Sequence, residues 1–132
     1  MSESSDPPKS PPFFIWDGDD IKAFRTVEML ESYVETEDVQ SGTYTTTYDA
    51  DGRRYHLAVV SRRVPIAFGL TSTVPAVSVQ SAQGAPAELE ALLSKLRSYA
   101  ERVSLRGLTR DEIRDLPPKE LVDLVTTATV VG

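Results

Sequence analysis

The 132-residue sequence contains no cysteine and only one histidine, His56. Without cysteine the protein can form no disulfide bond, thiolate nucleophile or cysteine-ligated zinc site. No run approaches the ~18 apolar residues that a membrane-spanning helix needs, and the first residues lack the basic start and apolar core of a secretory signal. A protein without disulfides suits a reducing compartment. We therefore expect a cytoplasmic protein that does not enter a membrane.

The common catalytic and nucleotide-binding motifs are also missing. There is no G-x-S-x-G elbow, no G-x-G-x-x-G loop and no phosphate-binding P-loop. Two acidic turns, "DGDD" at 17–20 and "DADG" at 49–52, lack the ligand spacing of an EF-hand calcium loop. Aspartate in turns most often serves the backbone, and His56 lies in the middle of a predicted strand. We therefore expect no enzymatic activity, no metal site and no cofactor.

Length and composition indicate one domain preceded by a tail. Apolar residues make up 40% and charged residues 26% of the chain, which is an ordinary globular mixture. Residues 1–12 contain four prolines and four serines, too little apolar surface to offset the entropy of ordering. We predict a disordered tail over 1–12 and a single α+β domain over 13–132, β-rich over 13–84 and helical over 85–132.

The acidic turns carry the strongest local structural signal. Asp17-Gly18 and Asp51-Gly52 each separate two segments of strand-like composition, and Asp-Gly between such segments is typical of a β-hairpin because glycine accepts the positive φ of a tight turn. Between the hairpins, residues 25–38 are predicted to form a helix with Thr26 as its N-cap and apolar residues at helical spacing. The order so far is ββα followed by ββ.

The segments after the second hairpin are predicted from their prolines and their periodicity. Residues 64–70 and 74–79 are short apolar runs that contain Pro65 and Pro75, so edge or irregular strands are expected there. Residues 86–104 carry a wide apolar stripe typical of a helix.

Two further helices are predicted beyond residue 104. Thr109 and Glu112 form a capping box, with Leu108 and Ile113 as a hydrophobic staple. Pro117 should end that helix and Pro118 open another. The predicted fold is α+β, an antiparallel sheet with two or three C-terminal helices on one face.

Charge is distributed unevenly along the chain. Residues 13–52 have a net charge of −8, whereas residues 53–132 have +3. Such an acidic half favours a basic partner and disfavours binding to nucleic acid, although acidity also serves solubility alone. The candidate partner-steering residues are the acids of the first turn and of the predicted helix: Asp17, Asp19, Asp20, Glu28, Glu31 and Glu35.

The first third of the domain resembles a pattern found in small bacterial proteins. The pattern has a DGD turn (17–19), "E-x-x-E-x-Y-[VLI]-E" (28–35), "D-V-x-x-G-x-Y" (38–44) and "Y-D-x-x-G" (48–52). It covers residues 13–54, and the remainder of the chain lies outside it. Some proteins with this pattern resemble immunity proteins, which protect a bacterium from its own toxin. The resemblance implies a non-catalytic, toxin-binding role and assigns no catalytic residue.

Three functions are compatible with these observations. The first is a protein-binding module of the immunity or inhibitor type, which neutralises a basic protein such as a toxin or nuclease through its acidic surface. The second is a structural or regulatory adaptor that self-associates through an edge strand or a C-terminal helix. The third is a small nucleic-acid-binding regulator, in which Arg53, Arg54, Arg62 and Arg63 contact phosphates while Tyr44, Tyr48 and Tyr55 stack on bases.

Overall fold

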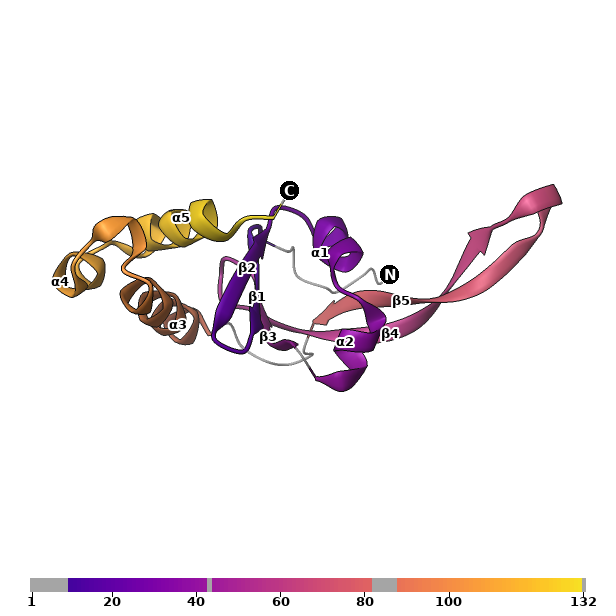
Figure 1. The fold of residues 1–132 in the computed structure, drawn as a ribbon, viewed down its shortest axis with the longest axis horizontal. Coiled ribbons are helices and arrows are strands. Elements are labelled where there is room, and N and C mark those ends of the chain that lie inside the picture. Colours follow the sequence, from indigo (N-terminus) through magenta and orange to yellow (C-terminus); the bar gives the residue numbers. More distant parts are fainter. Residues whose placement is uncertain (1–9, 43, 82–87, 132) are drawn as a thin grey trace, which may run out of the picture.

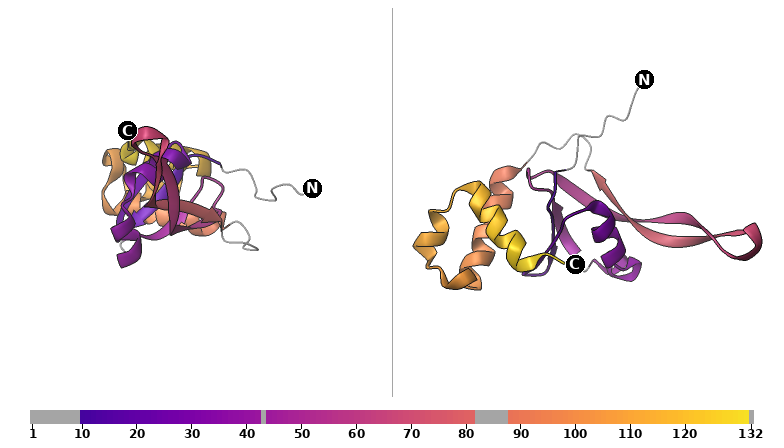
Figure 2. Two further views of the ribbon diagram at one scale, coloured as in Figure 1. Left: turned by 90° about the vertical axis from the view of Figure 1, so that its right-hand side faces the viewer. Right: turned by 90° about the horizontal axis from the view of Figure 1, so that it is seen from above.

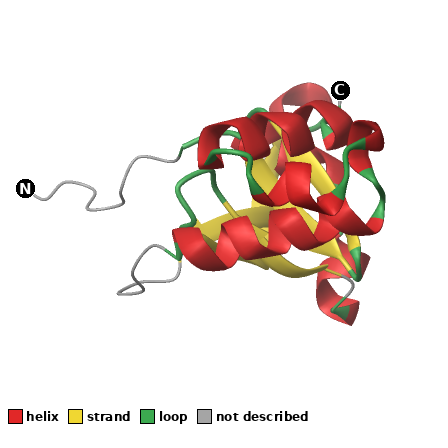
Figure 3. Ribbon diagram, turned by 90° about the vertical axis from the view of Figure 1, so that its left-hand side faces the viewer, coloured by secondary structure: helices red, strands yellow, loops and turns green. Residues whose placement is uncertain are grey.

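The computed structural model describes residues 10–42, 44–81 and 88–131. Its centre is a five-stranded antiparallel sheet in the order β2-β1-β3-β4-β5. Helices cover the sheet on both faces, and one hairpin of the sheet extends far beyond them (Figures 1 and 2). The predicted α+β class is confirmed, as is the packing of the C-terminal helices on one face (Figure 3). The strands are β1 (Phe13–Asp17), β2 (Asp20–Phe24), β3 (Tyr44–Tyr48), β4 (Arg54–Pro65) and β5 (Thr71–Ser81).

Strand β1 feeds two separate hydrophobic cores because its side chains alternate between the faces of the sheet. Phe14 and Trp16 point to the side covered by the C-terminal helices, whereas Phe13 and Ile15 point to the opposite side. All four side chains are at most 5% exposed. A slip of one residue in the register of β1 would exchange both sets, so the two cores together fix its pairing.

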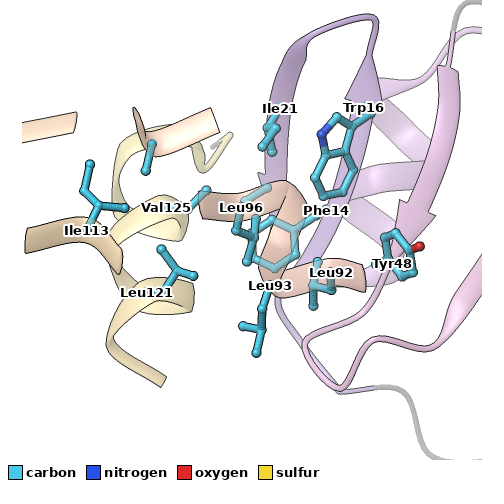
Figure 4. Packing of buried hydrophobic residues seen from close by; sticks show 12 residues of the cluster. Phe14, Trp16, Ile21, Tyr48, Leu92, Leu93, Leu96, Ile113, Leu121 and Val125 are labelled. Atoms are coloured by element: carbon cyan, nitrogen blue, oxygen red, sulfur yellow. The ribbon is translucent and has the colours of Figure 1, made fainter. Parts of the chain in front are cut away.

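The first core lies between the sheet and helices α3 (Leu89–Arg102), α4 (Arg110–Arg114) and α5 (Pro118–Thr129). In Figure 4, Leu92, Leu93 and Leu96 of α3 lie between the aromatic side chains of the sheet and the side chains of α5. The prediction of a helix over 86–104 is correct for 89–102, and residues 86–87 lie outside the described residues. The capping box is present with both of its hydrogen bonds, and Pro118 opens α5.

The second core is covered by two short helices instead of the single predicted one. Helix α1 (Val27–Tyr33) begins at Thr26, whose Oγ1 accepts the Met29 N–H at 3.1 Å, as expected for an N-cap. The chain then becomes extended at Val34, whose side chain is buried in the second core, and α2 (Thr36–Ser41) follows. The predicted continuous helix over 25–38 is therefore wrong, because the backbone of Val34 leaves the helical region (φ −80°, ψ 131°) and divides the segment into two helices.

Both predicted Asp-Gly hairpins are present. Asp17 pairs with Asp20 across a two-residue turn, in which Gly18 has a φ of +63°. The loop from Asp49 to Arg53 joins β3 to β4, and Gly52 has a φ of +83°. Glycine therefore supplies the left-handed conformation at each turn.

Of the two alternatives predicted around Pro65 and Pro75, edge or irregular strands, the structure has the first, because both prolines lie in a regular two-stranded ribbon at the edge of the sheet. Strands β4 and β5 pair without a register shift from Tyr55–Ser81 to Pro65–Thr71. The Val79 N–H donates to Glu31 and so faces away from β4. Alternate residues of a strand share that direction, so the nitrogen of Pro75 also faces outward. Proline therefore removes no bond from the ladder, and β5 is an edge strand as expected.

The outer edge of β2 is occupied by the end of the described chain. Val130 forms a parallel bridge with Ala23, and the Val131 N–H donates to the Ala23 carbonyl at 2.9 Å. At the other end, Ser10 contacts the β3–β4 loop, where its carbonyl accepts the Ala50 N–H at 2.9 Å. The rest of the predicted disordered tail, residues 1–9, lies outside the described residues.

Candidate functional site

The most prominent surface feature is the outer part of the β4–β5 hairpin, residues 61–75, which we call the arm. The arm extends away from the body along the long axis of the molecule (Figures 1 and 2). Every residue of the arm is exposed except Val64, which is half-buried. The two strands close at a short turn, η1 (Ala67–Gly69), where the Ile66 N–H donates to the Leu70 carbonyl at 2.9 Å. The arm therefore contributes to neither core.

The tip of the arm consists of large apolar side chains in contact with solvent. Ile66, Phe68 and Leu70 are 53%, 98% and 61% exposed. Phe68 also has a φ of +60°, a conformation that is a rare outlier for a bulky residue. An exposed ring and a left-handed backbone both cost free energy, and neither is offset by a contact within the described chain. The tip of the arm thus presents Phe68 to solvent although its exposure and its backbone conformation both cost free energy.

The charge of the arm is of one sign. Arg62 and Arg63 lie on its stem and are exposed, and the sequence has no acidic residue from 52 through 87. The chain as a whole carries a net charge of −6. The arm is thus a cationic, apolar-tipped projection from an anionic protein.

The six acids predicted to steer a partner lie in two separate groups. Asp17, Asp19 and Asp20 are exposed at the β1–β2 turn. The glutamates lie on and just after α1, at the other end of β2. Since the five residues of β2 span about 17 Å, the structure does not bring all six together on one patch.

Glu31 differs from the other five because the fold uses its carboxylate. Its Oε2 accepts the Val79 N–H at 2.8 Å, and the side chain is half-buried. This bond satisfies a donor on the open edge of β5, which would otherwise attract another strand. Glu28 and Glu35 are exposed. Glu31 is thus tied to the sheet, and the other five of the six predicted acids are exposed.

The second acidic turn is organised around a buried carboxylate, Asp49, which is 0% exposed. Its Oδ1 accepts the backbone N–H groups of Asp51 and Arg53 at 3.0 and 2.9 Å, and its Oδ2 accepts the Tyr55 hydroxyl at 2.8 Å. The Arg53 guanidinium lies 3.7 Å from Asp49 and 3.1 Å from Asp51. Burial, together with the Asp49 carboxylate, raises the pKa of Tyr55 above its ordinary value. This network serves the backbone of the turn.

Two of the three proposed base-stacking tyrosines are not available on the surface, and the side chain of the third, Tyr44, lies outside the described part of the chain. Tyr48 and Tyr55 are 2% and 5% exposed, and each lies in a hydrophobic core. His56 is exposed, and its Nε2 lies 3.2 Å from the Gln80 side-chain oxygen across the ribbon. Arg53 is engaged by Asp49 and Asp51. Tyr48 and Tyr55 therefore cannot provide the base-stacking surface that the nucleic-acid hypothesis requires.

A shallow groove of about 380 Å³ separates the first acidic turn from α3. Lys95 lies 5.6 Å above the Trp16 ring, and Arg102 lies 5.5 Å from the Tyr99 ring. The Arg102 guanidinium also donates to the Asp19 carbonyl. The Lys95 contact ties α3 to β1, the Arg102–Tyr99 contact lies within α3, and the Arg102–Asp19 hydrogen bond holds the turn against the helix, which gives the groove a structural role.

Within residues 10–42, 44–81 and 88–131, no group of three or more metal-ligating side chains comes together. In the same part of the chain, no helix has both the length and the apolar character needed to cross a membrane. No protein-family model, curated protein or solved structure matches the chain.

Sequence reasoning missed the arm as a candidate site. The apolar run over residues 64–70 predicts a strand because apolar residues are usually buried. Two signals for the arm are nevertheless present: glycine at position 69 between two segments that can pair, and the absence of acids from 52 through 87. Together they indicate a hairpin with a basic stem and an apolar turn.

Proposed function

We propose that this protein is a non-enzymatic protein-binding module that docks on its partner through the arm. The observation that supports this proposal is Phe68, which is 98% exposed in a left-handed conformation at the tip. Aromatic side chains that enter a pocket of a partner are the usual energetic anchors of protein interfaces. Ile66 and Leu70 flank this anchor.

The edges of the arm favour docking by the tip over pairing with another strand. An unpaired edge attracts other strands through its free N–H and C=O groups. The arm has Pro65 in one strand and Pro75 in the other, and each removes an N–H that would face outward. Arg62 and Arg63 add charge of one sign to the stem. These residues oppose strand addition and leave the tip as the surface that a partner can cover.

Replacing Phe68 by serine should abolish partner capture without affecting the fold, because the side chain contacts neither core. The measurement is capture from native lysate by the tagged full-length chain, with the bound proteins identified by mass spectrometry. Val103→Ser is the matched control, since Val103 is also an exposed apolar residue, 41% exposed, but lies at the end of α3. We expect a defined set of proteins to be lost with Phe68→Ser and kept with Val103→Ser. Identical sets for both variants would contradict the proposal.

A second function, neutralisation of a basic partner as in immunity proteins, is favoured by the first acidic turn. Asp17, Asp19 and Asp20 are exposed together there. A two-residue hairpin turn requires only its glycine, so three neighbouring carboxylates exceed what the fold needs. Such a cluster increases the association rate with a basic surface.

Reversing Asp19 and Asp20 to lysine should reduce capture of a basic partner at low salt and have little effect at high salt. Screening explains the difference, since the Debye length falls from about 10 Å at 0.1 M to about 3 Å at 1 M. The control is reversal of Glu28 and Glu35, at the other end of β2, whereas Glu31 is left intact because it bonds to Val79. Capture is compared at both salt concentrations. Equal capture by both double variants at low salt would contradict this function and would mean that Asp19 and Asp20 serve solubility alone.

A further inference from the structure

The arm has a complementary surface at the opposite end of the same molecule. A groove of about 380 Å³ lies between α5, the end of α4 and the loop before α4. Its apolar lining is Leu108, Leu116 and Leu124, all half-buried. We call it the leucine groove. Along the long axis, α4 and the start of α5 lie at one end and the arm at the other (Figures 1 and 2).

The charges of the two surfaces are complementary. Glu120 and Asp123 of α5 line the leucine groove, and Arg106 is the cation among its lining residues. The arm carries Arg62 and Arg63. The three residues from Arg63 to Ile66 span about 10 Å, so arginines on the stem would lie beside the carboxylates when the apolar tip contacts the leucines.

The groove between the first acidic turn and α3 does not fit the arm in this way. Two cations, Lys95 and Arg102, and one carboxylate, Asp19, line that groove, so its lining has a net positive charge that would repel the arginines of the stem. Strand addition is opposed by Pro65 and Pro75, as described above. Of the two grooves, the leucine groove therefore combines an apolar lining with an excess of carboxylates, and it matches the arm in both respects.

We propose that the occupant of the leucine groove is the arm tip of a second copy of this chain. This inference rests on the proposed function, because it names the partner of the arm. An arm at one end and a groove at the other cannot meet within one molecule. The contact is heterologous, leaves one free arm and one free groove at the ends of each assembly, and so allows further copies to add head to tail.

The contact is small, which determines how association should depend on concentration. The arm has fifteen residues, with three large apolar side chains at its tip, whereas a standard stable interface uses roughly 20–30 residues on each side. Association should therefore be weak. Sedimentation velocity of the purified full-length protein from the micromolar to the millimolar range should show an average mass that rises steadily and does not stop at a dimer.

Two variants, each defective at one end, test the head-to-tail arrangement. Phe68→Ser keeps the groove and loses the tip, while Leu124→Lys keeps the tip and places a cation in the groove. Each should be monomeric alone, and their equimolar mixture should form a one-to-one complex, because an intact tip then meets an intact groove. Glu120→Lys with Asp123→Lys is a second groove variant that leaves the leucines in place, and circular dichroism confirms folding of all three.

The outcomes separate this inference from the proposed function. A one-to-one complex in the mixture supports head-to-tail association. A wild-type protein that stays monomeric throughout the range overturns it, as does a mixture of the two variants that fails to pair while the wild type associates. If the wild type is monomeric but Phe68→Ser still loses proteins captured from lysate, the arm binds a different protein and the proposed function stands.

Discussion

Replacing Gly52 by alanine should lower the free energy of unfolding by about 2–5 kcal/mol. The left-handed conformation at a φ of +83° accounts for roughly 1–2 kcal/mol of this loss. The remainder, roughly 1–3 kcal/mol, comes from overpacking. A Cβ at this position would lie 2.5 Å from the backbone N and Cα of Leu89. The clash involves backbone at the start of α3, so no side chain can rotate away to relieve it.

Gly18→Ala is the matched control for this prediction. Gly18 has a similar φ of +63°, but apart from its chain neighbours no atom lies within 4 Å of the point that a Cβ would occupy. Only the conformational cost applies, so we expect a loss of about 1–2 kcal/mol. Urea denaturation of both variants measures the difference. Equal losses would mean that the β3–β4 loop and the start of α3 move apart at little cost, which would contradict the packing seen here.

Replacing Asp49 by alanine should cost about 3 kcal/mol or more. The substitution leaves two backbone N–H groups and the Tyr55 hydroxyl without their acceptor, and each unsatisfied buried donor costs roughly 1–3 kcal/mol. The Asp51 and Arg53 N–H groups are part-buried, which places the expected cost toward the lower end of their combined range. Denaturant unfolding is again the measurement.

Tyr55→Phe separates the organisation of the turn from the single tyrosine bond. It removes one donor to Asp49 and leaves the backbone bonds and the Arg53 contact in place. Its expected cost is about 1 kcal/mol. A loss in Tyr55→Phe as large as in Asp49→Ala would show that the hydroxyl, and not the turn, carries the stability of this network.

The features that sequence predicted correctly are those determined within a few residues. Asp17-Gly18, the Thr26 N-cap, the Thr109 capping box and Pro118 each act on backbone groups close to them in the chain. Each is present in the structure. Their physical chemistry is local, so one sequence is sufficient to recognise them.

The features that were missed or left open depend on contacts between distant residues. The break between α1 and α2 lies at Val34, whose side chain packs in a core that includes side chains of β1, β2, β4 and β5. The choice between edge and irregular strands at Pro65 and Pro75 depends on the pairing register, which places both nitrogens on the outer edges. A pattern along the chain contains neither piece of information.

The candidate site was predicted less well than the fold. The sequence predicted six acidic residues as the site, and five of them are exposed. The six lie in two separate groups, however, and Glu31 bonds to the sheet. The apolar tip was missed because the same residues, Ile66, Phe68 and Leu70, are ordinary core residues in most sequences. Only the three-dimensional arrangement shows that they have no core to join.

The separation of the arm from both cores has a consequence for how this protein can change. Since residues 61–75 pack on no helix and the ladder ends at a short turn, folding of the body places few demands on the identity of the tip. The tip can therefore be replaced by a different sequence of similar length while the body keeps its stability. The hairpin thus offers a grafting position at which a recognition sequence can be exchanged, by mutation or by design.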